Sequence, residues 1–153
     1  MTEDQQTENA VGLIFQHVAR LRNRLYDRGV EGHGLTSAQV YAINHLFRQD
    51  GRSQVELAGL LGIGTVALSG LVDRMEGAGW VARQPDPKDR RTKRIWLTDA
   101  ARAKRPALEK AARAVNDTSL AGFSPEEVET LLDMLRRVRT NLTEALDPPA
   151  GTG

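Results

Sequence analysis

The chain has 153 residues, of which 27% are charged, and its formal net charge is only +1, which argues against a general polyanion binder. It has no cysteine, which excludes structural disulfides, thiolate metal sites and cysteine-based redox switches. No apolar run approaches the roughly 20 residues of a membrane span, and the acidic N-terminus is unlike a signal peptide. We therefore expect a cytoplasmic protein of one domain, with no membrane partner.

The N-terminal part of the chain is predicted to contain a polar arm and two helices. Residues 1–9 show no apolar periodicity, which predicts a disordered arm. Apolar residues then recur with alternating spacings of three and four, which indicates a long amphipathic helix over about 10–30. After a glycine-rich loop, Thr36 and Gln39 form a capping-box pattern that begins a second helix.

The stretch from residue 53 to residue 79 predicts a helix-turn-helix. Ser53 and Glu56 form another capping box, and Gly62 is a typical helix stop. Apolar residues then recur at i, i+3, i+4 and i+7, and these are Leu68, Leu71, Val72 and Met75. The opposite face of this second helix carries small or hydrogen-bonding side chains. Such a face lets a helix approach base edges in a major groove.

The next stretch predicts a β-hairpin with a basic tip. Residues 80–83 and 93–97 have extended patterns, and the turn between them contains two prolines that exclude a helix. From Arg83 to Arg94 there are six basic residues against two acidic ones. Positive charge beside a recognition helix suits the DNA backbone and minor groove. The helix pair and the hairpin together predict a winged helix-turn-helix, a mainly α fold with a small β-hairpin wing.

The C-terminal part is predicted to be helical. Thr98 is a helix cap, and Pro106 should kink the helix that follows or delay its regular start. Ser124 and Pro125 begin a last helix with a long apolar stripe, and residues 147–153 form a disordered tail. The stripes of the first and last helices exceed what a small winged domain covers. They either join two subunits or pack on each other within one chain.

The wing GWVARQPDPKDRRTKRIWLT resembles that of MarR-family transcriptional regulators, whose pattern is Gly-Leu-Val-x-Arg, then Asp-Pro-x-Asp-x-Arg, then Leu-Thr. SQVELAGLLGIGTVALSGLVDRME and LAGFSPEEVETLL resemble the same family, and RR-x-KRI-x-LT is most similar to its SlyA branch. The resemblance implies one domain over 10–146, in which a winged helix-turn-helix at about 35–98 lies between dimerisation helices at about 10–30 and 99–146. It also implies a homodimer on a pseudopalindromic site in double-stranded DNA.

The candidate DNA contacts lie at two helix starts, on the recognition helix and in the wing. They are Ser53, Gln54, Thr65, Ala67, Ser69, Gly70, Arg74, Asp89, Arg90, Arg91, Lys93 and Arg94. At the helix starts, phosphate binding and simple capping are equally good explanations. The resemblance implies that Arg91 enters the minor groove while Asp89 holds its guanidinium, whereas the other wing cations contact phosphates. The alternative is that Asp89 and Arg91 are solvated turn charges.

Many MarR-family proteins bind small aromatic anions between the dimer helices and the winged domain. The positions that the resemblance assigns to such a pocket are Phe15, His17, Arg20, Val40, Tyr41 and His45. Arg20 would meet a carboxylate, and Phe15 and Val40 would line an apolar wall. The alternative is an ordinary core beside a solvated arginine.

Nothing in the sequence indicates catalysis, a metal site or a cofactor. The histidines lack paired spacing and cysteine neighbours, and no nucleophile elbow, phosphate loop or dinucleotide fingerprint occurs. The leading hypothesis is a homodimeric, sequence-specific repressor that a small aromatic or anionic ligand releases from DNA. The alternatives are a SlyA-like activator that displaces another repressor and a winged-helix module for protein or RNA contacts. An enzyme is the weakest hypothesis.

Overall fold

The computed structural model describes the backbone of residues 3–146 and the side chains of residues 10–146. The chain divides into two compact units, with the boundary after Val115. The second unit contains α7 (Pro125–Leu146), a helix with no buried residue. The disordered tail predicted at 147–153 lies outside the described residues.

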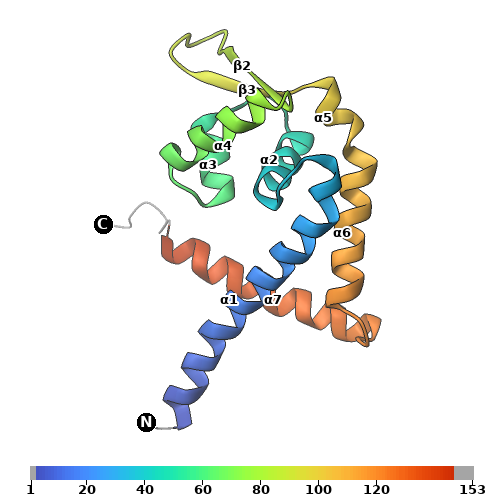
Figure 1. The fold of residues 1–153 in the computed structure, drawn as a ribbon. Helices are drawn as coiled ribbons and strands as arrows, with labels where there is room; N and C mark the ends of the chain where they lie inside the picture. Colours follow the sequence, from blue (N-terminus) through green and yellow to red (C-terminus); the bar gives the residue numbers. More distant parts are fainter. Residues whose placement is uncertain (1–2, 147–153) are drawn as a thin grey trace, which may run out of the picture. The chain divides into compact units, whose positions relative to one another are not determined.

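The first unit is a winged helix-turn-helix (Figure 1). Its sheet has the order β1-β3-β2, and both pairings are antiparallel. Helices α3 and α4 form the helix-turn-helix, and β2 and β3 form the wing hairpin beside them. The elements in chain order are α1 (Glu3–Val30), η1 (Glu31–His33), α2 (Ser37–Arg48), β1 (Arg52–Ser53), α3 (Gln54–Leu61), α4 (Thr65–Gly77), β2 (Val81–Pro85), β3 (Lys93–Leu97), α5 (Asp99–Ala103) and α6 (Arg105–Ser119).

The ends of the helices are set by capping side chains, by a left-handed glycine and by a proline. Thr36 with Gln39, and Ser53 with Glu56, make complete capping boxes at α2 and α3. Gly62 ends α3 in the left-handed conformation with φ 65°. The break predicted near Pro106 is also present, because α5 ends at Ala103 and α6 begins at Arg105.

The core of the first unit is formed mainly by α2, α3, α4 and β3. All four apolar residues predicted for the inner stripe of α4 are at most 5% exposed. They belong to one cluster with Val40, Ile43, Leu57 and Ile95, which are completely buried. This cluster fixes which face of α4 remains available to a partner.

Helix α1 and strand β1 differ from the predicted elements. Helix α1 begins at Glu3, so the arm predicted as disordered over 1–9 is helical from Glu3 onward. That segment has no apolar periodicity to indicate a helix, although glutamate and glutamine are good helix formers and acidic residues favour a helix N-terminus. The second difference is β1, a third strand of two residues that pairs with Ile95 and Arg94. A strand this short carries no alternating pattern.

The long apolar stripes are uncovered within each unit. On α1, Val11, Ile14 and Leu21 are 49–57% exposed. On α7, Leu132, Leu135 and Leu142 are 41–60% exposed. No single described helix is long and apolar enough to cross a membrane, and only α3 and α4 taken together, bent by 106°, pass that test by length and composition.

Gly51 closes the turn between α2 and β1 at a point where no side chain fits. Its φ is 69°, its N–H donates to the carbonyl oxygen of Ile95 at 3.0 Å, and a Cβ there would lie 2.5 Å from the Trp96 ring. Gly62 has a similar φ of 65° but open space around it.

We expect Gly51→Ala to destabilise the fold more than Gly62→Ala does. Both substitutions place alanine in the left-handed region, at a cost of about 1–2 kcal/mol, whereas only Gly51→Ala adds overpacking, at about 1–3 kcal/mol. Urea unfolding followed by circular dichroism at one protein concentration measures the difference. Equal losses in the two variants would show that the ring contact is not tight.

Candidate nucleic-acid interface

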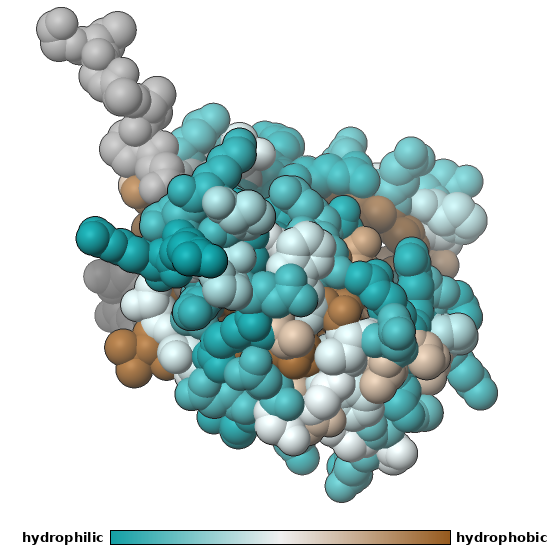
Figure 2. Space-filling model, turned by 90° about the horizontal axis from the view of Figure 1, so that it is seen from above, coloured by the Kyte–Doolittle hydropathy of each residue, from teal (hydrophilic) through white to brown (hydrophobic). Residues whose placement is uncertain are grey.

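Helix α4 presents a nearly uncharged first half to solvent. Thr65, Val66 and Ala67 are exposed, and Ser69 and Gly70 are half-buried. Arg74 is exposed one turn further along. Seen from above in Figure 2, the surface is mostly hydrophilic with scattered apolar patches. Small side chains on an exposed helix face, next to basic groups, are what a major-groove reading helix requires.

Arg83 of β2 joins the reading helix to the rest of the site. Its Nη1 pairs with Asp73 at 2.7 Å and with Glu76 at 2.9 Å. Its Nε donates to Oε1 of Gln54 at 2.9 Å, and its Nη2 donates to the carbonyl oxygen of Ser69 at 3.3 Å. One guanidinium therefore links α3, α4 and β2.

The same contacts neutralise the acidic side of α4. The backbone N–H of Arg83 donates to Glu76, and this bond, followed by the guanidinium contact, lowers the pKa of Glu76. Without these contacts, Asp73 and Glu76 would be two free negative charges on α4 that repel a polyanion. Paired with Arg83, they act as fixed supports for the wing strand instead.

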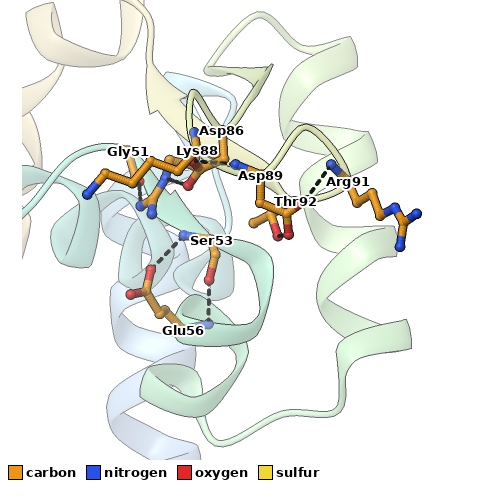
Figure 3. A network of polar contacts seen from close by, with 9 residues as sticks. Gly51, Ser53, Glu56, Asp86, Lys88, Asp89, Arg91 and Thr92 are labelled. Atoms are coloured by element: carbon orange, nitrogen blue, oxygen red, sulfur yellow. Dashed lines mark hydrogen bonds and ion pairs between the residues drawn. The ribbon is translucent and has the colours of Figure 1, made fainter.

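The wing turn is built around the buried carboxylate of Asp86 (Figure 3). Its Oδ1 accepts from the N–H groups of Lys88 at 2.6 Å and Asp89 at 3.2 Å, while its Oδ2 pairs with Nε of Arg94. Nη1 of Arg94 donates to the carbonyl oxygen of Gly51 at 2.7 Å. The Lys88 N–H, followed by Arg94, lowers the pKa of Asp86, so this carboxylate stays ionised and holds the turn at neutral pH.

Contrary to the prediction, Asp89 does not hold the guanidinium of Arg91. It accepts from the backbone N–H of Arg91 at 3.0 Å and from the hydroxyl of Thr92 at 3.0 Å. An aspartate bonds most readily to backbone groups two residues on, which makes it a turn former rather than a side-chain clamp. Figure 3 shows the Arg91 guanidinium pointing away from Asp89, and the whole side chain is exposed.

The wing cations therefore divide into two sets. Arg90, Arg91 and Lys93 are exposed, so their charges are available to a polyanion. Arg94 is half-buried and donates hydrogen bonds to Asp86 and to the carbonyl oxygen of Gly51. It therefore anchors the wing, in addition to the phosphate contact predicted for it.

A cavity of about 460 Å³ brings the candidate residues at the start of α3 together with the wing. Ser53, Gln54 and Val55 line one side, and Arg91, Thr92 and Lys93 line the other. The start of α3 thus faces two cations across an open hollow, and both favour a phosphate group. Ser53 also caps α3, since its Oγ accepts from the N–H of Glu56 at 3.2 Å.

The residues predicted for an effector pocket are dispersed. Val40 is completely buried in the core, and the hydroxyl of Tyr41 donates to Asn23 at 2.7 Å. Phe15, His17 and Arg20 are exposed along α1. Burial, followed by Arg48 and Arg52, lowers the pKa of His45. Two further cavities, one at the junction of α1 with α2 and one between α2 and α6, include none of these six residues in their linings.

Sequence reasoning missed the two residues that organise the site. Arg83 occupies the arginine position of the Gly-Leu-Val-x-Arg pattern, but that pattern does not indicate its partners, which lie on other elements. Asp86 has a local signal, since an aspartate before Pro87 at the start of a basic turn is a typical turn-forming pattern.

Comparison with known proteins gives consistent matches. A MarR family model matches residues 33–92. A probable transcriptional regulator from Pseudomonas aeruginosa is 31% identical, with 86% of this chain and 98% of that chain covered and a TM-score of 0.78. A MarR transcriptional regulator from Methanosarcina mazei Go1 is 23% identical, with 90% and 99% covered and a TM-score of 0.85. A mutant MarR from E. coli, solved in complex with operator DNA, is 25% identical, with 84% and 93% covered and a TM-score of 0.76.

The Asp86 clamp has a definite pH dependence. A carboxylate whose pKa is lowered by folding stabilises the folded form above its ordinary pKa, and this stabilisation is lost as pH falls through the lowered value. We expect the amide resonances of Lys88 and Asp89 to keep their neutral-pH positions until the pH is below about 3.9, the usual aspartate value. An acid titration followed by ¹⁵N–¹H NMR measures this, and Asp86→Asn should abolish the transition. A transition at or above the usual value would rule out the clamp.

Proposed function

This chain belongs to the MarR family of transcriptional regulators, and from that premise we propose that it is a homodimeric repressor that binds a pseudopalindromic operator. The observation that carries the proposal is the joint presentation of α4 and the wing. Arg83 fixes a small-residue helix face beside the exposed cations Arg90, Arg91 and Lys93. The helix would read the major groove while the wing contacts the backbone and the neighbouring minor groove.

The cavity between α3 and the wing supports a defined position on the duplex. The N-terminus of α3 and the cations at Arg91 and Lys93 face one hollow, where one phosphate would be held from two sides. The complex of the E. coli MarR mutant with operator DNA supports the same use of this fold. Contacts of this kind fix register, while the exposed face of α4 provides sequence choice.

A second copy of the chain is the proposed partner of α1 and α7. Their apolar stripes are exposed within each unit, and stripes of this length are association sites. A two-fold dimer would present two α4 helices and two wings to successive turns of DNA, so a bound dimer would cover a promoter.

A small aromatic anion is the proposed effector, and it would act by changing the spacing of the two reading heads. Exposed Phe15 and Arg20 on α1 offer an aromatic surface and a cation for it, with His17, Tyr41 and His45 as further candidates. Val40 belongs to the core, so it would contribute only as support behind the pocket wall.

We expect Arg91→Ala to weaken binding to the duplex upstream of the protein's own gene by at least about tenfold and to reduce the salt slope by about one per wing. Fluorescence anisotropy across a salt series, with a scrambled duplex for comparison, measures both effects. Lys110→Ala removes the same charge from α6 and should leave binding unchanged. Equal wild-type affinity for both duplexes would contradict a sequence-specific regulator.

We expect the wild-type chain to sediment as a dimer and Ile14→Glu to shift it toward the monomer, because a charge in an apolar seam is costly to bury. Gln16→Glu adds the same charge to α1 outside the stripe and is the matched control. Sedimentation equilibrium over a concentration series measures the masses. A monomeric wild type, or equal dissociation of both variants, would refute the proposed seam.

A further inference from the structure

Val66 is the most exposed large apolar side chain among the described residues, at 86%. It is the second residue of α4, directly after Thr65. Since its side chain makes so little contact with the rest of the chain, the fold gains almost nothing from an apolar residue there. An isolated exposed valine is ordinary on a protein surface, so its position on the helix decides whether it has a function.

Helix geometry puts Val66 at the centre of the outward face. The inward face of α4 is defined by its buried residues, of which Leu68 and Val72 are completely buried. With successive residues separated by about 100°, Val66 and Gly70 both lie opposite that face and are neighbours at i and i+4. The next residue on this line, Asp73, is paired with Arg83. The outward face therefore carries the apolar side chain of Val66, no side chain at Gly70, and the carboxylate of Asp73 neutralised by Arg83.

Among the described residues, nothing requires glycine at position 70. Its φ is not among the positive ones, and an added Cβ would meet only Nη1 of Arg74, at an ordinary contact distance of 3.6 Å. Glycine in a helix interior is nevertheless less favourable than alanine. The absence of a side chain at Gly70 is explained if a partner molecule approaches the helix closely at this position.

We propose that Val66 contacts the C5-methyl group of a thymine in the major groove and that Gly70 leaves room for the edge of that base pair. The inference rests on the proposed DNA-binding function. Thymine is the base that presents a methyl group in the major groove, and the N-terminal residues of a recognition helix are those that meet base edges. Valine has no hydrogen-bonding group, so a cytosine amino group facing it would be left without a partner.

The first experiment is a thermodynamic cycle between protein and DNA. Wild-type protein selects a duplex from a random-sequence pool, and each thymine of the selected duplex is then replaced by deoxyuridine, which lacks the methyl group. We expect one thymine in each half-site at which the replacement weakens wild-type binding about fourfold, the factor for one buried methyl group. In Val66→Ala the same replacement should have no effect. Because Val66 is exposed, this variant should fold as the wild type does.

The second experiment separates stability from recognition. Gly70→Ala should raise the melting temperature, since alanine is the better helix former, yet weaken binding to the selected duplex. Gly77→Ala is the control, because its Cβ would have no atom within 4 Å and it lies about 10 Å further along the helix. It should not weaken binding.

The outcomes distinguish this inference from the proposed function. If no sequence is enriched from the pool, the proposed function fails, and this inference fails with it. A second outcome is that a sequence is enriched while each deoxyuridine replacement weakens binding by Val66→Ala as much as binding by the wild type. That result would refute the thymine contact, and the regulator proposal would stand. Unchanged binding by Gly70→Ala would overturn the close approach at that position.

Discussion

The site depends on a single guanidinium held between three elements. Arg83 is only 18% exposed and pairs with two carboxylates of α4, one amide of α3 and one backbone carbonyl. A planar group with several fixed donors suits such a junction, and lysine would not replace it. Because both ends of the junction belong to secondary structure, α4 and β2 keep a fixed mutual position. In the proposed complex, one rigid part of the protein would contact two grooves of DNA.

In the wing, carboxylates have the organising role that the guanidinium of Arg83 has between α3, α4 and β2. At its tip, anions organise the backbone and leave cations free. Asp86 and Asp89 accept backbone N–H groups and thereby define the turn, while Arg90 and Arg91 extend from it. Each carboxylate also offsets part of the repulsion among neighbouring cations. A net charge of +1 is thus compatible with a strongly local basic surface.

The parts of this structure that follow from local rules were predictable from sequence. The capping boxes at Thr36 and Ser53, the inner stripe of α4 and the hairpin strands each have a signal within a few residues. What was not predictable is set by contacts between distant residues. Strand β1 forms because it pairs with β3. Arg83 donates to Gln54, which lies 29 residues away in sequence. The family resemblance predicts a side-chain partner for Asp89, whereas its carboxylate accepts from the backbone N–H of Arg91.

The wing tip has a further consequence for motion. Residues 87–91 are all exposed, so the tip is held by hydrogen bonds and has no apolar side chain to bury. Water can replace such bonds one at a time, so we expect the tip to open locally at a low free-energy cost and its amides to exchange hydrogen without unfolding of the core. If the wing binds a duplex as proposed, the loss of conformational entropy would fall on these few residues. Pro85 and Pro87 reduce that penalty, since proline limits the conformations available to the open loop.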